Sequence, residues 1–171
     1  MSVPPRLAPP PAPLIRVSRG TGTGPTRLAA FDAALVAAGV PAFNLLPLSS
    51  VIPTGAEVRV VEPGDQLPGT HGDLLYCVYA TAAALDPGAQ AWAGVAWGVR
   101  DDGSGAGLFV EHHAASEEAL QSDLDATLGA MMAARPGEYH EAGRLVASVT
   151  AVDRPAVAVV LASYAAVGWS A

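Results

Sequence analysis

The sequence predicts an α+β layered domain in which several strands pack with two main helices. The chain has 171 residues, of which 51% are hydrophobic, so it is long enough to bury one core. Two segments repeat apolar residues at helical spacing, and strand-like segments follow one another in runs instead of alternating with helices. Such runs are typical of α+β proteins and differ from the strict βαβ order of parallel folds.

The N-terminal part predicts an arm, a strand, a loop and a helix in that order. Residues 1–13 are rich in proline and are expected to form an extended, disordered arm. Leu14–Ser18 is a short strand candidate, followed by a glycine-rich loop at residues 20–24. Thr26 is a suitable N-cap and Gly39 a suitable stop, so a helix is expected between them.

That helix is expected to bury one face. Leu28, Phe31 and Leu35 recur at helical spacing and form an apolar stripe. Asp32 lies at the edge of this stripe. It is either an ordinary solvated carboxylate or a functional one, and its position alone favours neither.

A strand, a glycine loop and a helix also open dinucleotide-binding folds, so that class has to be weighed. The spacing here is GxGxG, and Pro25 stands where the third glycine of GxGxxG is expected. The acidic residue expected about twenty positions later is replaced by the region around Asn44. The signal for a dinucleotide is therefore weak.

An adjacent serine pair, Ser49-Ser50, lies inside the apolar stretch Asn44–Pro53, which is expected to be a buried strand. Serine is uncommon in strands and costs free energy when it is buried without hydrogen bonds. Either the strand ends there and the hydroxyls form a turn, or the peptide bond between the serines is itself reactive. Pro47 removes a ladder donor and confines the segment to a sheet edge or a bulge.

The remaining elements are read from alternation, apolar runs and turn residues. A long helix is expected from about Ser116 to Arg135, with Gly137 after it and one apolar face, formed by Leu120, Leu124, Leu128, Met131 and Met132. Strands are expected at Glu57–Glu62, Leu74–Thr81, Trp92–Val99, Gly107–His113, Leu145–Val152 and Ala156–Ala165.

Composition excludes several classes of function. The net charge is −7, which argues against a nucleic-acid partner. All nine basic residues are arginine, so the chain has neither a Walker A lysine nor a lysine that could bind pyridoxal phosphate. Amine–carbonyl chemistry would require a carbonyl that belongs to the protein.

No segment resembles a signal peptide or a membrane span, so we expect no membrane partner and a cytoplasmic location. The single cysteine, Cys77, sits in an apolar strand-like run and is expected to be an inert core thiol.

Glu111 ends an apolar strand, residues 107–111, and alternation places it on the same face as Phe109. A carboxyl among apolar neighbours has a raised pKa, which suits a proton donor near neutral pH. The alternative is an exposed glutamate at a strand end. His112 and His113 follow, but neighbouring strand residues face opposite ways, so no metal site is expected.

Three pieces of the sequence resemble the pyruvoyl-dependent arginine decarboxylase family. They are Ala30-Phe-Asp-Ala-Ala-Leu35, Asn44-Leu-Leu-Pro-Leu-Ser-Ser-Val-Ile-Pro53 and Gly107-Leu-Phe-Val-Glu111. The resemblance covers nearly everything after residue 14. It implies a four-layer αββα sandwich of mainly antiparallel strands with two main helices, as a single domain over residues 14–171.

The resemblance also implies that the chain cleaves itself between Ser49 and Ser50. Ser50 becomes a pyruvoyl group at the head of an α chain, 50–171, and Ser49 ends a β chain, 1–49. The pyruvoyl carbonyl then condenses with the α-amine of the substrate, with neither pyridoxal phosphate nor a metal. Glu111 corresponds to the proton donor, and Asn44 to the residue that polarises the processing carbonyl.

The implied substrate is L-arginine, decarboxylated to agmatine and CO2. Asp32 matches the position associated with the guanidinium, and Leu35 an apolar wall beside the substrate stem. The implied assembly is a homotrimer of processed αβ units with active sites between protomers. Two alternatives remain: the same scaffold acting on another amino acid, and an uncleaved, non-enzymatic trimeric homologue.

Overall fold

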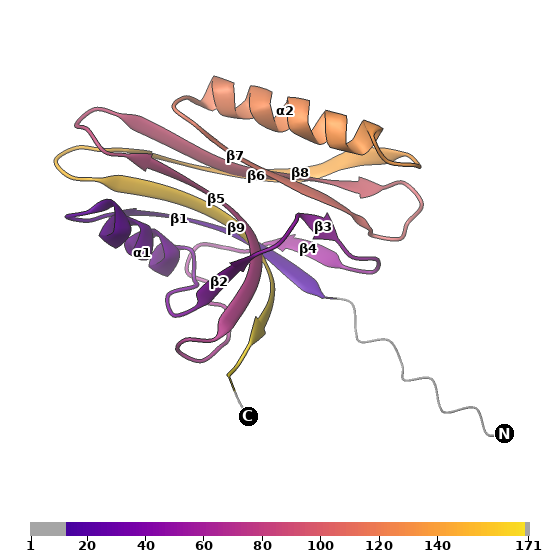
Figure 1. Ribbon diagram of the computed structural model, residues 1–171, viewed down its shortest axis with the longest axis horizontal. Coiled ribbons are helices and arrows are strands. Elements are labelled where there is room, and N and C mark those ends of the chain that lie inside the picture. Colours follow the sequence, from indigo (N-terminus) through magenta and orange to yellow (C-terminus); the bar gives the residue numbers. More distant parts are fainter. Residues whose placement is uncertain (1–12, 170–171) are drawn as a thin grey trace.

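The computed structural model describes residues 13–169 as four layers. Two β-sheets pack face to face, helix α2 covers one outer surface and helix α1 covers the other (Figure 1). The disordered arm expected over residues 1–13 lies, apart from Pro13, outside the described residues. The elements in chain order are β1 (Leu14–Thr23), α1 (Arg27–Ala37), β2 (Asn44–Pro47), β3 (Val51–Ile52), β4 (Glu57–Val60), β5 (Leu74–Ala84), β6 (Gln90–Arg100), β7 (Gly107–Ala114), α2 (Glu117–Ala133), β8 (Tyr139–Thr150) and β9 (Ala156–Val167).

One sheet has five strands in the order β2-β5-β9-β1-β4, and the other has four in the order β3-β7-β6-β8. Most pairs are antiparallel; β1 with β4 and β2 with β5 are the parallel pairs in the described sheets. The predicted α+β sandwich of mainly antiparallel strands with two helices is therefore confirmed.

The core lies between the two sheets, and each helix adds an outer layer. Phe109, Ile52 and Val95 are buried in the space between the sheets. The apolar stripe predicted for α2 is confirmed: Leu120, Leu124 and Leu128 are buried against the four-stranded sheet, and Met131 and Met132 pack at their side. The predicted N-cap at Thr26 is present, and Ser116, where the second helix was expected to begin, is also an N-cap, because both hydroxyls accept hydrogen bonds from the first turns of their helices.

The glycine-rich segment at residues 20–24 is not a loop, as predicted, but mostly the second half of β1. Its glycines are needed because α1 lies directly on the strand. A Cβ on Gly20 would lie 2.2 Å from the carbonyl oxygen of Ala34, and one on Gly22 would lie 2.4 Å from the Ala34 nitrogen. Close packing between helix and strand, and not the binding of phosphate, explains these glycines.

The same close approach changes the buried face of α1. The residues fully buried under the helix are Ala30 and Ala34, joined by Leu35 at 8% exposure. Leu28, predicted to lie in the apolar stripe, is 75% exposed. This part of the prediction was wrong because only small side chains fit where helix backbone and strand backbone nearly touch.

The stretch Asn44–Pro53 is not one buried strand, as predicted. It forms two short strands in different sheets: β2 pairs with β5 in the five-stranded sheet, and β3 pairs with β7 in the four-stranded sheet. The serine pair lies at the crossover between them. Pro47 is the last residue of β2, which is an edge strand, as the missing donor requires.

Most other boundaries differ from the predictions by a few residues. β8 is the exception, since it begins at Tyr139 and not near Leu145. Cys77 is fully buried, and burial raises the pKa of its thiol to about 12. Within residues 13–169, neither helix is both long and apolar enough to cross a bilayer, and we find no group of three potential metal ligands.

Candidate active site

The backbone at Ser50 has an uncommon conformation. Its φ is 67°, which makes it the one non-glycine residue with positive φ among residues 13–169. A side chain in this left-handed region costs about 1–2 kcal/mol, so the surrounding contacts must impose it. After the serine pair, the Phe109 N–H donates to the Ser50 carbonyl at 2.8 Å. Before it, the Leu48 N–H donates to the Cys77 backbone carbonyl at 2.9 Å. The crossover is therefore held by one strand from each sheet.

The Ser50 side chain points at Glu111. The Ser50 residue is 7% exposed, and its hydroxyl donates to the Glu111 carboxylate, with Oγ 3.0 Å from Oε2 and 3.3 Å from Oε1. Glu111 lies two residues after Phe109 on β7, so alternation turns it toward the space between the sheets, as predicted. The two side chains are 61 residues apart in the sequence.

Burial raises the pKa of the Glu111 carboxyl, as predicted from its apolar strand. The Ser50 hydroxyl and the nearby His112 act in the opposite direction but are outweighed. The carboxyl thus keeps its proton to a higher pH than an ordinary glutamate does. It can exchange a proton with a group at the position of Ser50.

A tyrosine that the sequence analysis missed completes this group. Tyr164 on β9 donates its hydroxyl to the Val51 carbonyl at 3.0 Å, and its ring meets Phe109 edge-on with centroids 6.0 Å apart. Burial, with the Glu111 charge, raises the pKa of Tyr164, which keeps the hydroxyl a donor. Tyr164 is the single aromatic residue of β9, and this was the one signal that could have drawn attention to it.

A cleft of about 540 Å³ opens beside Glu111. It exists because β2 pairs with β5 only along residues 74–77, and β3 pairs with β7 only at Leu108 and Gly107. Residues 78–84 of β5 and residues 110–114 of β7 therefore lie at sheet edges that β2 and β3 leave unpaired. The cleft is lined by residues 78–83 of β5, by residues 111–113 at the end of β7, and by Arg27 from the first turn of α1.

The two histidines beside Glu111 face different ways, as predicted. His112 turns toward α2, where its Nε2 lies 2.7 Å from the Thr127 hydroxyl. His113 is exposed at the rim of the cleft. Neither joins a group of three potential metal ligands within the described residues.

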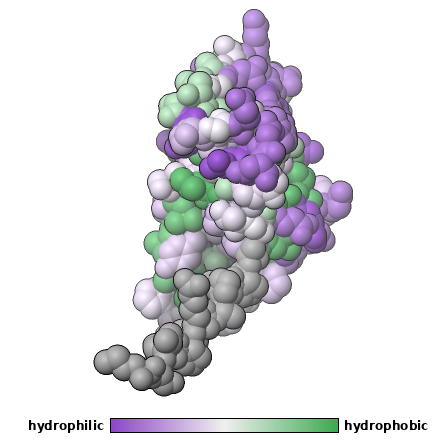
Figure 2. Space-filling model, turned by 90° about the vertical axis from the view of Figure 1, so that its right-hand side faces the viewer, coloured by the Kyte–Doolittle hydropathy of each residue, from purple (hydrophilic) through white to green (hydrophobic). Residues whose placement is uncertain are grey.

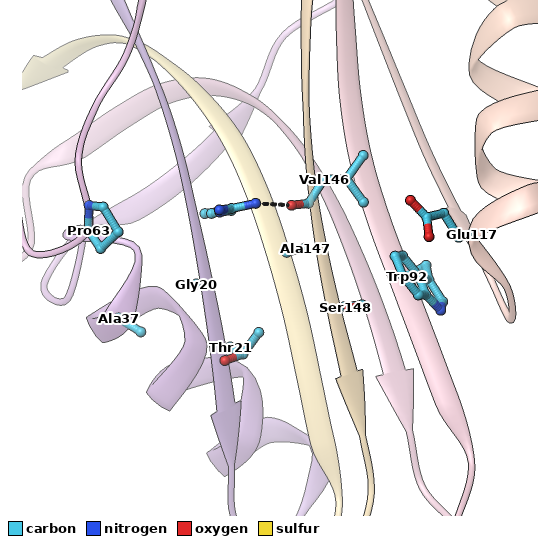
Figure 3. A pocket seen from close by; sticks show the side chains of 10 residues that line it. Gly20, Thr21, Ala37, Pro63, Trp92, Glu117, Val146, Ala147 and Ser148 are labelled. Atoms are coloured by element: carbon cyan, nitrogen blue, oxygen red, sulfur yellow. Dashed lines mark hydrogen bonds between the residues drawn. The ribbon is translucent and has the colours of Figure 1, made fainter.

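A second cleft, of about 520 Å³, lies at the opposite side of the sandwich, between β1 and β8. Figure 3 shows Trp92 and Glu117 on one side of this cleft and Pro63 on the other. Arg19 also lines this cleft and donates to the Val146 carbonyl at 2.7 Å. None of the predicted site residues lines this cleft, so the candidate active site is the one at Ser50 and Glu111.

The family described as pyruvoyl-dependent arginine decarboxylase (PvlArgDC) has a profile that matches residues 14–167. The chain belongs to the pyruvoyl-dependent arginine decarboxylase family. A Halobacterium salinarum protein named pyruvoyl-dependent arginine decarboxylase is 40% identical over 157 residues, covering 89% of this chain and 94% of the relative. A Thermococcus sibiricus protein of the same name is 32% identical over 139 residues, covering 80% and 84%. One from Methanosarcina mazei is 35% identical over 108 residues, covering 63% and 64%.

The residues at the crossover of this pyruvoyl-dependent arginine decarboxylase family member fit a pyruvoyl group. Such a group replaces a serine at a chain break. Ser50 lies where the chain crosses from one sheet to the other, and among residues 13–169 it is the one non-glycine residue with positive φ. The carboxyl of Glu111 lies within hydrogen-bonding distance of that position, and Glu111 itself lines the cleft.

The other residues implied by the resemblance lie elsewhere in the single chain. The Asn44 amide donates to the Gly72 carbonyl at 2.8 Å, at the far end of β2 from the serine pair. Asp32 is exposed on α1, and Leu35 packs into the cluster between α1 and the five-stranded sheet. One chain therefore brings together Ser49, Ser50 and Glu111, but not Asn44, Asp32 or Leu35.

Proposed function

We propose that the chain decarboxylates L-arginine to agmatine and CO2, with a pyruvoyl group that it makes by cleaving its own Ser49–Ser50 bond. The observation that carries this proposal is the hydrogen bond from the Ser50 hydroxyl to Glu111 at a strained crossover. The family and the names of its relatives support the reaction class, a carbon–carbon lyase.

In the proposed cleavage, the Ser50 hydroxyl, oriented by its hydrogen bond to Glu111, adds to the Ser49 carbonyl carbon and gives up its proton, which the departing nitrogen later gains. The bond between the Ser49 carbon and the Ser50 nitrogen then breaks. The nitrogen gains a proton, and an ester joins the two residues. Loss of the proton from Cα of residue 50 expels Ser49 as a carboxylate, and water then releases ammonia and leaves the pyruvoyl group. Breaking the chain here also releases the backbone conformation at φ 67°.

In the proposed decarboxylation, the pyruvoyl group supplies a protein-bound carbonyl that condenses with the substrate α-amine and accepts the electrons left as CO2 departs. Glu111 supplies the proton that the substrate α-carbon then needs. Burial keeps that carboxyl protonated to a higher pH than an ordinary glutamate, which suits this role.

We propose that Asp32, Leu35 and Asn44 complete the site from a neighbouring copy in a homotrimer of αβ units (β chain 1–49, α chain 50–171). Support comes from the positions of these residues on α1 and at the start of β2, away from the serine pair, and from the sheet edges beside the cleft that β2 and β3 leave unpaired. In this arrangement Asp32 pairs with the substrate guanidinium, and Leu35, which retains 8% exposure, contributes an apolar edge beneath it.

Surface hydrophobicity gives further support to self-association. Figure 2 shows polar side chains concentrated in the upper part of one face, with hydrophobic side chains gathered lower, over the sheets. Exposed large hydrophobic residues in the strands include Leu14, Val51, Val60 and Val167. Exposed apolar surface of this kind is typical of an interface.

The intact mass of purified protein tests the cleavage. We expect two fragments, one ending at Ser49 and one beginning with a pyruvoyl group at position 50. Ser50→Ala should remain a single chain, whereas Ser122→Ala, on the exposed face of α2, should cleave like the wild type. A full-length wild type at neutral pH after prolonged incubation, or a cleaved Ser50→Ala, would overturn the proposal.

Mixing two impaired variants tests the shared site. Glu111→Gln and Asp32→Ala each spoil one side of every site in a trimer of identical chains. When both are produced together, some interfaces combine an intact Glu111 with an intact Asp32, so part of the decarboxylase activity should return. No recovery in verified mixed trimers would place both residues in a site within one chain.

A further inference from the structure

Tyr164 links the two sheets at the proposed cleavage site. It belongs to β9 of the five-stranded sheet, whereas the Val51 carbonyl that accepts its hydrogen bond belongs to β3 of the four-stranded sheet. Its ring packs edge-on against Phe109, whose backbone N–H holds the Ser50 carbonyl. The tyrosine thus contacts both the residue after Ser50 and the residue that anchors Ser50.

The need for such a link follows from the shortness of β3. That strand has two residues, and it pairs with β7 through Val51 with Leu108 and Ile52 with Gly107. A strand of two residues is shorter than most strands in proteins, so few ladder hydrogen bonds hold its backbone in place. Val51 is also 56% exposed, so its side chain adds little packing.

Cleavage would increase the importance of the contacts that hold residues 50–52. In the intact chain, residue 50 is held by the peptide bonds on both sides of it. After the bond to Ser49 breaks, only contacts of residues 50–52 and the chain that follows hold the new terminus. Among the described residues these contacts include the Phe109 N–H bond to the residue 50 carbonyl, the β3–β7 pairing, the Tyr164 hydroxyl bond to Val51 and the burial of the Ile52 side chain in the core.

We propose that Tyr164 is a positioning residue whose hydroxyl holds the backbone at Val51 so that residue 50 stays against Glu111, during cleavage and in the cleaved enzyme. This inference rests on the proposed function. Tyr164 need not touch the substrate, because it acts through the Val51 carbonyl, 3.0 Å from its hydroxyl. The raised pKa of Tyr164 keeps the donor proton in place throughout the neutral range.

Tyr164→Phe is the discriminating variant, because it keeps the ring against Phe109 and removes only the hydroxyl. We expect it to slow cleavage and to lower kcat per cleaved chain, each by roughly 2- to 12-fold, the range of one neutral hydrogen bond. KM for arginine should stay unchanged, because the residue acts on backbone and not on substrate. Tyr139→Phe, at the start of β8 with its ring beside Arg100 and outside the cleft, is the matched control and should behave as the wild type.

The outcomes separate this inference from the function on which it rests. An uncleaved wild type refutes the proposed function itself. A cleaved wild type with an equally fast and equally active Tyr164→Phe refutes the role of the hydroxyl and leaves the proposed function standing.

Amide hydrogen exchange gives a second measurement that does not depend on activity. In cleaved protein, the first residues of the α chain should exchange faster in Tyr164→Phe than in the wild type, while β6 and β9 exchange alike. Equal exchange at Val51 and Ile52 would refute the positioning role even if the variant were less stable as a whole.

Discussion

The close contact between β1 and α1 allows a sharp test of the fold with Gly22→Ala. A Cβ at this position would lie 2.4 Å from the Ala34 nitrogen and 2.5 Å from the Ala30 carbonyl oxygen, both backbone atoms. Ordinary van der Waals contact begins at 3.4 Å, so the helix must move by about 1 Å, the difference between 3.4 and 2.4 Å. No rotation of a side chain can relieve this clash.

Overpacking of this kind costs about 1–3 kcal/mol, and we expect about 3 kcal/mol here because the obstacle is backbone. For a protein of this length, that corresponds to a Tm lower by roughly 6–12 °C. Thermal unfolding is best followed by circular dichroism in a Ser50→Ala background, so that the chain stays whole. Protein concentration must be held constant, because association makes Tm depend on it.

Gly129→Ala is the matched control. Gly129 lies within α2, and a Cβ there would meet no heavy atom within 4 Å. Replacing a glycine inside a helix by alanine stabilises by about 0.5–1 kcal/mol, so Tm should rise. A Gly22→Ala protein whose Tm matches its parent while Gly129→Ala raises it would refute the close approach of α1 to β1.

Four further predictions concern the site and the core. Glu111→Gln should still cleave, because the glutamine oxygen can accept the Ser50 hydrogen bond, yet lose roughly 100- to 10,000-fold in CO2 release from arginine, as expected for a lost proton donor; full activity would remove its role. Burial raises the Glu111 pKa above its ordinary 4.5, so kcat should fall as pH rises through the raised pKa, and a flat kcat profile would contradict this. The same raised pKa means that protonation of Glu111 stabilises the folded protein fully below pH 4.5, and this stabilisation is lost as pH rises through the raised pKa. Asp32→Ala should lower kcat/KM for arginine by roughly 10- to 100-fold, the range of a lost charged hydrogen bond, while Asp123→Ala on the exposed face of α2 should not; an unchanged arginine preference would move recognition elsewhere. Cys77, with its pKa raised to about 12, should resist thiol reagents at neutral pH until the protein is denatured, and rapid labelling of folded protein would contradict its burial.

Features that depend on neighbouring residues were predictable from the sequence. The caps at Thr26 and Ser116 and the leucine stripe of α2 follow from local hydrogen bonding and helical period, and all are present. The side of β7 on which Glu111 lies follows from the two-residue period of a strand. The raised pKa of that carboxyl follows in turn from its apolar neighbours.

Features that depend on how layers meet were not predictable in the same way. Residues 20–24 have the composition of a loop, yet they lie mostly in strand β1, and their glycines are required because α1 packs directly against that strand. The pattern of the apolar stretch around the serine pair predicts one strand, but its first half pairs with β5 in one sheet and its second half pairs with β7 in the other. Local propensity carries no information about either neighbour.

The sequence by itself determined that the chain has a serine pair in an apolar stretch, a carboxyl at the end of a strand and no lysine. The tertiary structure alone decided that Ser50 meets Glu111 across 61 residues, and that Tyr164 reaches Val51 across 113. The physical reason is that periodicity specifies which face of an element a side chain occupies. Which distant side chain it then meets depends on strand order, register and the packing of the two sheets.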